Sequence, residues 1–177
     1  MVDALIGLLE DGDVQPTTAA IAARAGVAER TIFQHFPDRD ALFLAVGARQ
    51  TERLTAMWEP VVRTGPFAER LDAFVEQRAR ILEVVTPVRR GALLMEPFSE
   101  AVSEGLAGFR KLKRREVERV FEPELDALPA DERATTVAAL GAVVSWSSWE
   151  ELRRHQGLSV PRARAAMRRA VAALLGA

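Results

Sequence analysis

The sequence lacks the residues on which many metal sites and nucleophilic enzymes depend. Its 177 residues include no cysteine and only two histidines, His35 and His155. Without thiols the chain forms neither disulfide bonds nor thiolate metal sites, and two histidines cannot form a histidine-rich metal site. It also lacks a phosphate-cradling glycine-rich loop and the Glu-x-x-His motif of a di-iron bundle. We therefore expect a protein that is not an enzyme and needs no metal or cofactor.

Long apolar runs are absent as well. The longest run without a charged residue, Ala134–Trp149, has 16 residues, whereas a membrane-spanning helix needs about 20. The opening residues Met1-Val2-Asp3 lack the basic flank of a secretory signal. We therefore expect no membrane association and a cytoplasmic location.

Strong helix formers dominate what is present. Alanine, leucine, arginine and glutamate make up about half of the chain, and all four favour helices. Apolar residues recur at helical spacing between proline and glycine positions, and alternation with a period of two is nearly absent. The sequence thus predicts an all-α fold of about nine helices, at roughly 2–11, 18–25, 29–35, 39–59, 67–85, 88–95, 99–121, 130–156 and 160–175.

The first three predicted helices are short and fit a helix-turn-helix. Such a pair needs a small residue on the first helix, a left-handed turn residue and an apolar anchor on the second. Ala22, Gly26 and Ile32 supply these in order. A purely structural helical hairpin also needs a small residue and a glycine, so spacing alone leaves the two interpretations open.

The polar residues of the second helix favour DNA binding. Arg30 can bind guanine through two hydrogen bonds, Gln34 can bind adenine, and Thr31 can bind a base or a phosphate. The net charge of this region disfavours DNA binding. Residues 1–50 contain four arginines and seven acidic residues, a net charge of −3, whereas affinity for duplex DNA depends on neutralisation of its phosphates. We expect Arg24, Arg30 and Arg39 to gather on one face and the acidic residues on the other.

Residues 1–50 resemble the DNA-binding domain of the tetracycline-repressor (TetR) family. The resemblance lies in Thr17-Thr18, in Ile-Ala-Ala-Arg-Ala-Gly-Val-Ala at 21–28, and in Thr-Ile-Phe-Gln-His-Phe-Pro-Asp-Arg-Asp-Ala-Leu-Phe at 31–43. It implies phosphate contacts from Thr18, Thr31, Phe33, His35 and Arg39, and base contacts from Glu29, Arg30, Thr31 and Gln34.

Three features depart from the family pattern. Ala28 stands in place of a capping serine, which costs about 0.5–2 kcal/mol of local helix stability. Phe33 stands in place of tyrosine and cannot offer a hydroxyl group to a phosphate. The basic segment that often precedes the first helix is absent.

The resemblance also implies a division of the chain into two domains. Residues 1–46 would form the helix-turn-helix domain, the helix at 39–59 would connect it, and residues 47–177 would bind an effector and form a homodimer through the last two long helices. We expect large, adaptable side chains and a few polar ones to line the effector pocket. The candidates are Trp58, Phe74, Gln77, Arg78, Ile81, Met95, Phe98, Phe109 and Trp146.

The last two helices have surfaces suited to self-association. Small residues follow one stripe of the 130–156 helix and apolar residues the next, so that the helix has almost no polar face. Burial within one protomer remains the alternative to a two-fold four-helix interface. The interface candidates are Val137, Leu140, Gly141, Val144, Ser148, Met167, Ala170 and Leu174.

A basic run, Arg110-Lys111-Leu112-Lys113-Arg114-Arg115, occupies the 99–121 helix. It resembles a nucleic-acid patch, but Glu116, Glu118 and Glu122 follow at spacings that favour ion pairs along the helix. We therefore expect a helix surface neutralised by ion pairs.

Taken together, these features predict a homodimeric DNA-binding transcriptional regulator. Its partners would be a palindromic duplex operator and a small-molecule effector that releases it, as for a repressor. The acidic amino-terminal domain, Ala28 and Phe33 keep an alternative open: a helical ligand-binding or scaffolding protein with a degenerate DNA-binding domain.

Overall fold

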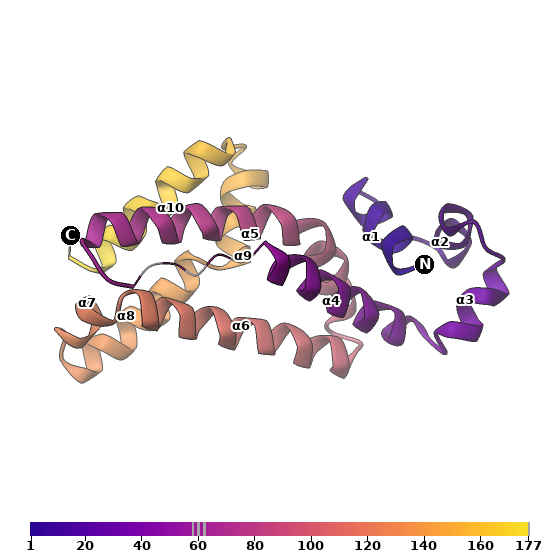
Figure 1. The fold of residues 1–177 in the computed structure, drawn as a ribbon, viewed down its shortest axis with the longest axis horizontal. Helices are drawn as coiled ribbons and strands as arrows, with labels where there is room; N and C mark the ends of the chain where they lie inside the picture. Colours follow the sequence, from indigo (N-terminus) through magenta and orange to yellow (C-terminus); the bar gives the residue numbers. More distant parts are fainter. Residues whose placement is uncertain (58, 60, 62, 177) are drawn as a thin grey trace. The chain divides into compact units, whose positions relative to one another are not determined.

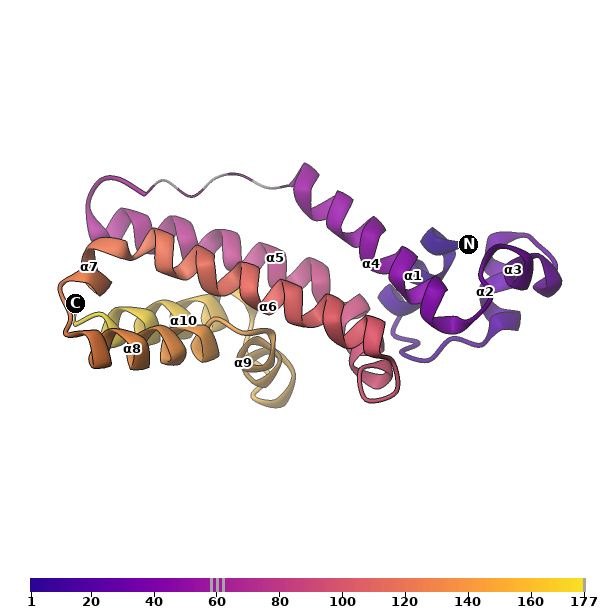
Figure 2. The same ribbon diagram turned by 90° about the horizontal axis from the view of Figure 1, so that it is seen from below.

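The computed structural model describes residues 1–57, 59, 61 and 63–176, and within them all regular elements are helices, as predicted. Ten α-helices and one π-helical turn follow one another (Figures 1 and 2). They are α1 (Val2–Glu10), α2 (Thr18–Ala25), α3 (Glu29–His35), α4 (Arg39–Ala56), α5 (Phe67–Met95), α6 (Glu100–Val120), α7 (Glu122–Asp126), α8 (Ala130–Val143), α9 (Trp146–Glu150), η1 (Glu151–His155) and α10 (Val160–Leu174). No helix among the described residues is long and apolar enough to cross a membrane.

The chain divides into two compact units, and the long helices α5 and α6 contribute to both. Unit 1 comprises Met1–Trp58 and Val84–Gly108. Its core joins α1 to α4 with the second half of α5 and the first half of α6. The buried side chains include Leu5, Leu9, Val46, Val88 and Val102. The amino-terminal helices therefore share one apolar core with residues of α5 and α6.

Unit 2 comprises Glu59–Glu83 and Phe109–Ala177. Its core is larger and surrounds Trp149, which is fully buried, and the edge-on ring pair Phe74–Phe121, whose centroids are 5.1 Å apart. Helices α8 and α10 pack against each other, as Figure 2 shows. Arg70 ties α5 to the short helix α7, because it pairs with Glu124 and donates to the Val120 carbonyl oxygen at 2.5 Å.

Helix α5 contradicts the predicted break at Pro87. Proline lacks an amide donor and normally ends or kinks a helix, at a cost of about 3 kcal/mol. The helix nevertheless continues from Phe67 to Met95 with Pro87 inside it. Leu82 and Val88, on either side of the proline, are both buried in apolar cores. Burial on both sides of Pro87 thus outweighs the local cost.

The predicted single helix at 130–156 is also wrong. Helix α8 ends at Val143, and Ser145 has extended backbone and accepts a hydrogen bond from the Ser148 amide at 3.2 Å, so that it caps a new helix. A π-helical turn follows, held by Arg153, which binds the Glu83 carboxylate through two nitrogens at 2.9 and 3.2 Å. The small-residue stripe predicted along this helix is therefore interrupted at Ser145.

Candidate nucleic-acid interface

Local sequence rules set the bounds of α2 and α3. The Thr17 hydroxyl accepts a hydrogen bond from the Ala20 amide at 3.1 Å and caps α2. Gly26 ends the helix with φ of +67°, a conformation that side chains with a Cβ rarely adopt. Ala28 begins α3 without a side-chain cap, as the sequence indicated.

Helix α3 is held by one buried residue and exposes most of the others. Ile32 is buried in the unit 1 core. The ring of Phe33 is 59% exposed, although it is apolar. Thr18 and Thr31 are half-buried, and the remaining predicted DNA-contacting residues are exposed: Glu29, Arg30, Gln34, His35 and Arg39. The structure therefore brings a continuous set of polar side chains to the outer face of α3.

The start of α4 supplies the next polar positions. The Asp38 carboxylate accepts a hydrogen bond from the Ala41 amide at 2.8 Å and caps the helix. The guanidinium group of Arg39 lies over the ring of Phe43, 5.7 Å from its centroid. Phe43 is buried, so this contact fixes the Arg39 side chain, for which the described part of the chain shows no ion pair with a carboxylate.

Ion pairs away from α3 use three of the acidic residues of the amino-terminal domain. Arg24 of α2 pairs with Asp11, Arg49 of α4 pairs with Asp3 at 3.0 Å, and Arg53 of α4 pairs with Glu10 at 2.9 Å. The hydrogen bond that Arg49 donates to the Asp3 carboxylate raises the pKa of Arg49. Arg24 thus binds an acidic residue at the end of α1, and the gathering of Arg24, Arg30 and Arg39 on one face stays a prediction. Three of the seven acidic residues are thereby neutralised within the domain.

Two glycines with a structural role escaped the sequence analysis. A Cβ atom on Gly7 would lie 2.6 Å from an Nη atom of Arg24, so this glycine makes room for the Arg24–Asp11 pair. A Cβ atom on Gly91 of α5 would lie 2.7 Å from a methyl carbon of Leu9. Gly91 thus allows α5 to approach α1 closely. Neither has positive φ, so no turn signal marks them in the sequence.

The predicted effector-pocket residues fall in both units. In unit 2, Phe74, Gln77 and Arg78 are buried, and Ile81, Phe109 and Trp146 are half-buried. In unit 1, Met95 is half-buried and Phe98 is 87% exposed. Trp58 lies outside the described residues. The assignment of these nine residues to one pocket stays a prediction.

Arg78 forms a buried ion pair with Glu116. Its side chain is 1% exposed, its Nη2 atom lies 2.6 Å from a Glu116 carboxylate oxygen, and its guanidinium lies 5.0 Å from the centroid of the Phe74 ring. Burial lowers the pKa of Arg78 and raises the pKa of Glu116, because both charged forms lose hydration. The pair links α5 to α6 inside unit 2.

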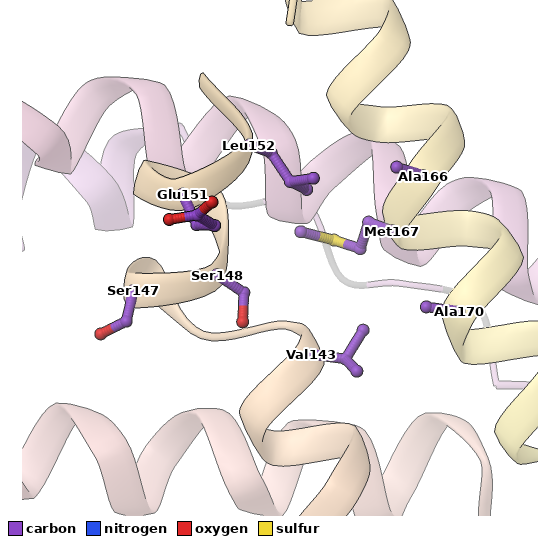
Figure 3. A pocket seen from close by; sticks show the side chains of 8 residues that line it. All are labelled: Val143, Ser147, Ser148, Glu151, Leu152, Ala166, Met167 and Ala170. Atoms are coloured by element: carbon purple, nitrogen blue, oxygen red, sulfur yellow. The ribbon is translucent and has the colours of Figure 1, made fainter. Parts of the chain in front are cut away.

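The predicted dimer-interface residues differ in burial. Val137, Leu140, Val144 and Met167 are buried in the unit 2 core, whereas Gly141, Ser148, Ala170 and Leu174 are half-buried. A groove of about 420 Å³ opens between α10 and the α8–α9–η1 segment (Figure 3). In Figure 3 the side chains of Met167 and Leu152 point into this groove. Its lining residues are Val143, Ser147, Ser148, Glu151, Leu152, Ala166, Met167 and Ala170.

The groove shares three residues with the predicted interface: Ser148, Met167 and Ala170. Ser147, Glu151 and Leu152 were not predicted for the interface because the sequence pattern did not reveal the break at Ser145 that begins α9. Among the described residues no cluster of histidine, aspartate and glutamate could hold a metal ion.

Solved structures share this fold over nearly the whole chain. A transcriptional regulator from Rhodococcus sp. Rha1 superposes with a TM-score of 0.75 at 20% identity, over 99% of this chain and 94% of that one. A proposed transcriptional regulator from Pseudomonas aeruginosa PAO1 gives 0.66 at 19% identity, over 99% and 88%. A TetR transcriptional regulator from Rhodococcus sp. RHA1 gives 0.54 at 20% identity, over 99% and 94%.

Similarity in sequence is concentrated in the amino-terminal domain. No curated protein matches the chain. Residues 2–46, which contain α1 to α3 and the start of α4, match the family model of the bacterial regulatory proteins of the tetR family. Residues 2–46, whose third helix exposes its polar face, are therefore similar to the amino-terminal domain of the tetR family of bacterial regulatory proteins.

Proposed function

We propose that the protein is a homodimeric transcriptional repressor that binds a palindromic DNA operator through α3 and is released by a small-molecule effector. The observation that carries the proposal is the exposed polar face of α3 on a helix anchored by buried Ile32. Arg30 and Gln34 are the base-reading candidates, and Thr18, Thr31 and Arg39 the phosphate-binding ones. A helix of this kind fits the major groove, with two half-sites about 34–36 Å apart or a multiple of that distance.

The groove beside α10 supports self-association. Apolar side chains line most of it, and exposed alanines at 134, 138 and 142 follow the adjacent surface of α8. Small residues allow helices of two protomers to approach closely. In this proposal Ser148, Met167 and Ala170 contact the second protomer, whereas Val137, Leu140 and Val144 support the interface from the core.

The effector would act by changing the separation of the two α3 helices. The effector can shift the equilibrium between the DNA-binding and the released conformations only by the difference between its binding free energies for the two. Unit 1 contains α1 to α4 together with parts of α5 and α6. A displacement of α5 or α6 would therefore alter the packing of the core that also buries Ile32 of α3.

Electrophoretic binding to the DNA upstream of its own gene, over a series of salt concentrations, tests the proposal. We expect a discrete complex whose affinity falls with salt and which contains two protomers per duplex. The absence of binding at low salt would instead support a helical ligand-binding or scaffolding protein with a degenerate DNA-binding domain.

A further inference from the structure

The second half of α6 carries a concentration of positive charge. Six cationic residues lie between Arg110 and Arg119, against two carboxylates, Glu116 and Glu118. The sequence predicted that carboxylates would neutralise this run. In the structure Glu116 turns inward to Arg78, while Glu118 pairs with Arg114 at 3.2 Å. Glu116, one of the carboxylates expected to neutralise this run, thus pairs with the buried Arg78 instead.

Three of these cations form a line along the helix, which we call the basic stripe: Lys111, Arg115 and Arg119. They are spaced four residues apart and therefore share one face of α6, about 6 Å from one another along its axis. All three side chains are exposed. The structure gives none of them an ion pair within the described part of the chain.

We propose that the basic stripe binds the phosphate backbone of duplex DNA without regard to sequence. This inference rests on the proposed function, because it takes duplex DNA as the partner of the protein. The amino-terminal domain is short of phosphate-binding charge, because Arg24, Arg49 and Arg53 are all paired with its own acidic residues. Cationic side chains elsewhere in the chain would then contribute to the phosphate neutralisation on which affinity for duplex DNA depends.

The chemistry of the stripe favours phosphates over a lipid surface. Guanidinium groups bind phosphate oxygens through two hydrogen bonds. Membrane-surface helices need a broad apolar face beside their cations. Within residues 109–120, all of which are described, Leu112 is the one exposed apolar side chain, at 57%. The surface is thus polar apart from one leucine.

The experiment compares the full-length protein with a triple variant of the basic stripe, Lys111→Gln, Arg115→Gln and Arg119→Gln. Fluorescence anisotropy follows binding to a duplex of arbitrary sequence between about 25 and 200 mM salt, the range over which phosphate contacts dominate. We expect the slope of log K against log salt to fall by about 0.9 for each cation that neutralises a phosphate, and the affinity at low salt to fall at least tenfold.

A control triple variant, Arg63→Gln, Arg80→Gln and Arg133→Gln, removes the same charge from other surfaces of unit 2. Arg80 and Arg133 pair with Glu59 and Asp126. We expect it to bind like the unaltered protein. Equal losses in both triple variants would mean that net charge alone acts, and would overturn the inference. An unchanged slope in the stripe variant would overturn it too.

Two further measurements separate the possible causes. Arg30→Ala should lower affinity for the upstream DNA but leave binding to the arbitrary duplex intact. If it does so while the stripe variant changes nothing, the proposed function stands and the stripe has no role. If the stripe variant loses binding only to vesicles of equal parts phosphatidylcholine and phosphatidylglycerol, the partner is a membrane and the inference fails.

Discussion

At the scale of single residues, Arg30 is the side chain that we propose reads a base. It is exposed on α3, and the structure gives it no acidic partner within the described residues. Neighbouring arginines illustrate the contrast, because Arg24 and Arg49 bind carboxylates of the same domain. Sequence spacing identified the face of α3, but it could not tell which arginines are paired.

Arg30→Ala should weaken binding to the operator by about 1–3 kcal/mol and relax the preference at one base pair, because direct readout of a base is lost. Competition binding with single-base operator variants measures both effects. Arg63→Ala, at an exposed arginine outside α3, serves as the control and should change neither. An equal loss on every DNA sequence would assign Arg30 to a phosphate instead.

Gly91→Ala should destabilise unit 1 by about 1–3 kcal/mol, because overpacking forces buried atoms to shift. The added methyl group would meet Leu9, which is 2% exposed and has no room to move. Chemical denaturation measures the change in the free energy of unfolding.

Gly7→Ala provides the comparison for Gly91→Ala. Its methyl group would meet the exposed end of Arg24, which can swing away, and alanine favours the helix over glycine by about 0.5–1 kcal/mol. We expect little or no loss of stability. Equal effects at the two glycines would contradict the close packing of α1 against α5.

At the scale of the helices, α5 and α6 show where local patterns stop being informative. Pro87 predicts a helix end, yet apolar burial on both sides keeps α5 continuous. Glu116 stands at a spacing suited to an ion pair along α6, yet it turns into the core. In α2, where Thr17 and Gly26 mark the ends, local rules sufficed. Long-range packing therefore decided the elements that the sequence failed to predict.

Glu116→Gln should cost about 3–5 kcal/mol, because it leaves the buried guanidinium of Arg78 without a counter-charge. Glu118→Gln is the matched control two residues away on the same helix. It breaks only the exposed pair with Arg114 and should cost about 0.3–0.5 kcal/mol. Thermal and urea unfolding compare the two variants. Similar small losses would show that Arg78 does not depend on Glu116.

At the scale of the whole molecule, each of the two units combines separate stretches of the chain, and the predicted domain boundary at residue 46 stays a prediction. The helix-turn-helix was predictable because its motif is short and local. The sequence contains no comparable motif for an effector pocket. Its candidates, among them Phe74 and Phe98, are residue types that a core also contains, they lie in different units, and their assignment to a pocket stays a prediction. The groove beside α10 depends on the turn at Ser145, which the helical pattern of the sequence conceals.

Ala170→Arg should convert the proposed dimer to a monomer, because it places a charged side chain in an apolar groove. Sedimentation velocity measures the change in mass. Ala107→Arg, at an exposed position of α6, is the control and should remain dimeric. A dimer that persists in Ala170→Arg would remove this groove from the interface.

The central claim is that two copies of α3 read a two-fold symmetric DNA sequence. Selection of bound duplexes from a random library, followed by sequencing, tests it most directly. The account predicts an enriched palindrome whose half-sites are separated by about one helical turn of DNA or a multiple of it. It also predicts that enrichment at one position of each half-site disappears with Arg30→Ala. Recovery of no motif, or of a motif that Arg30→Ala leaves unchanged, would contradict it.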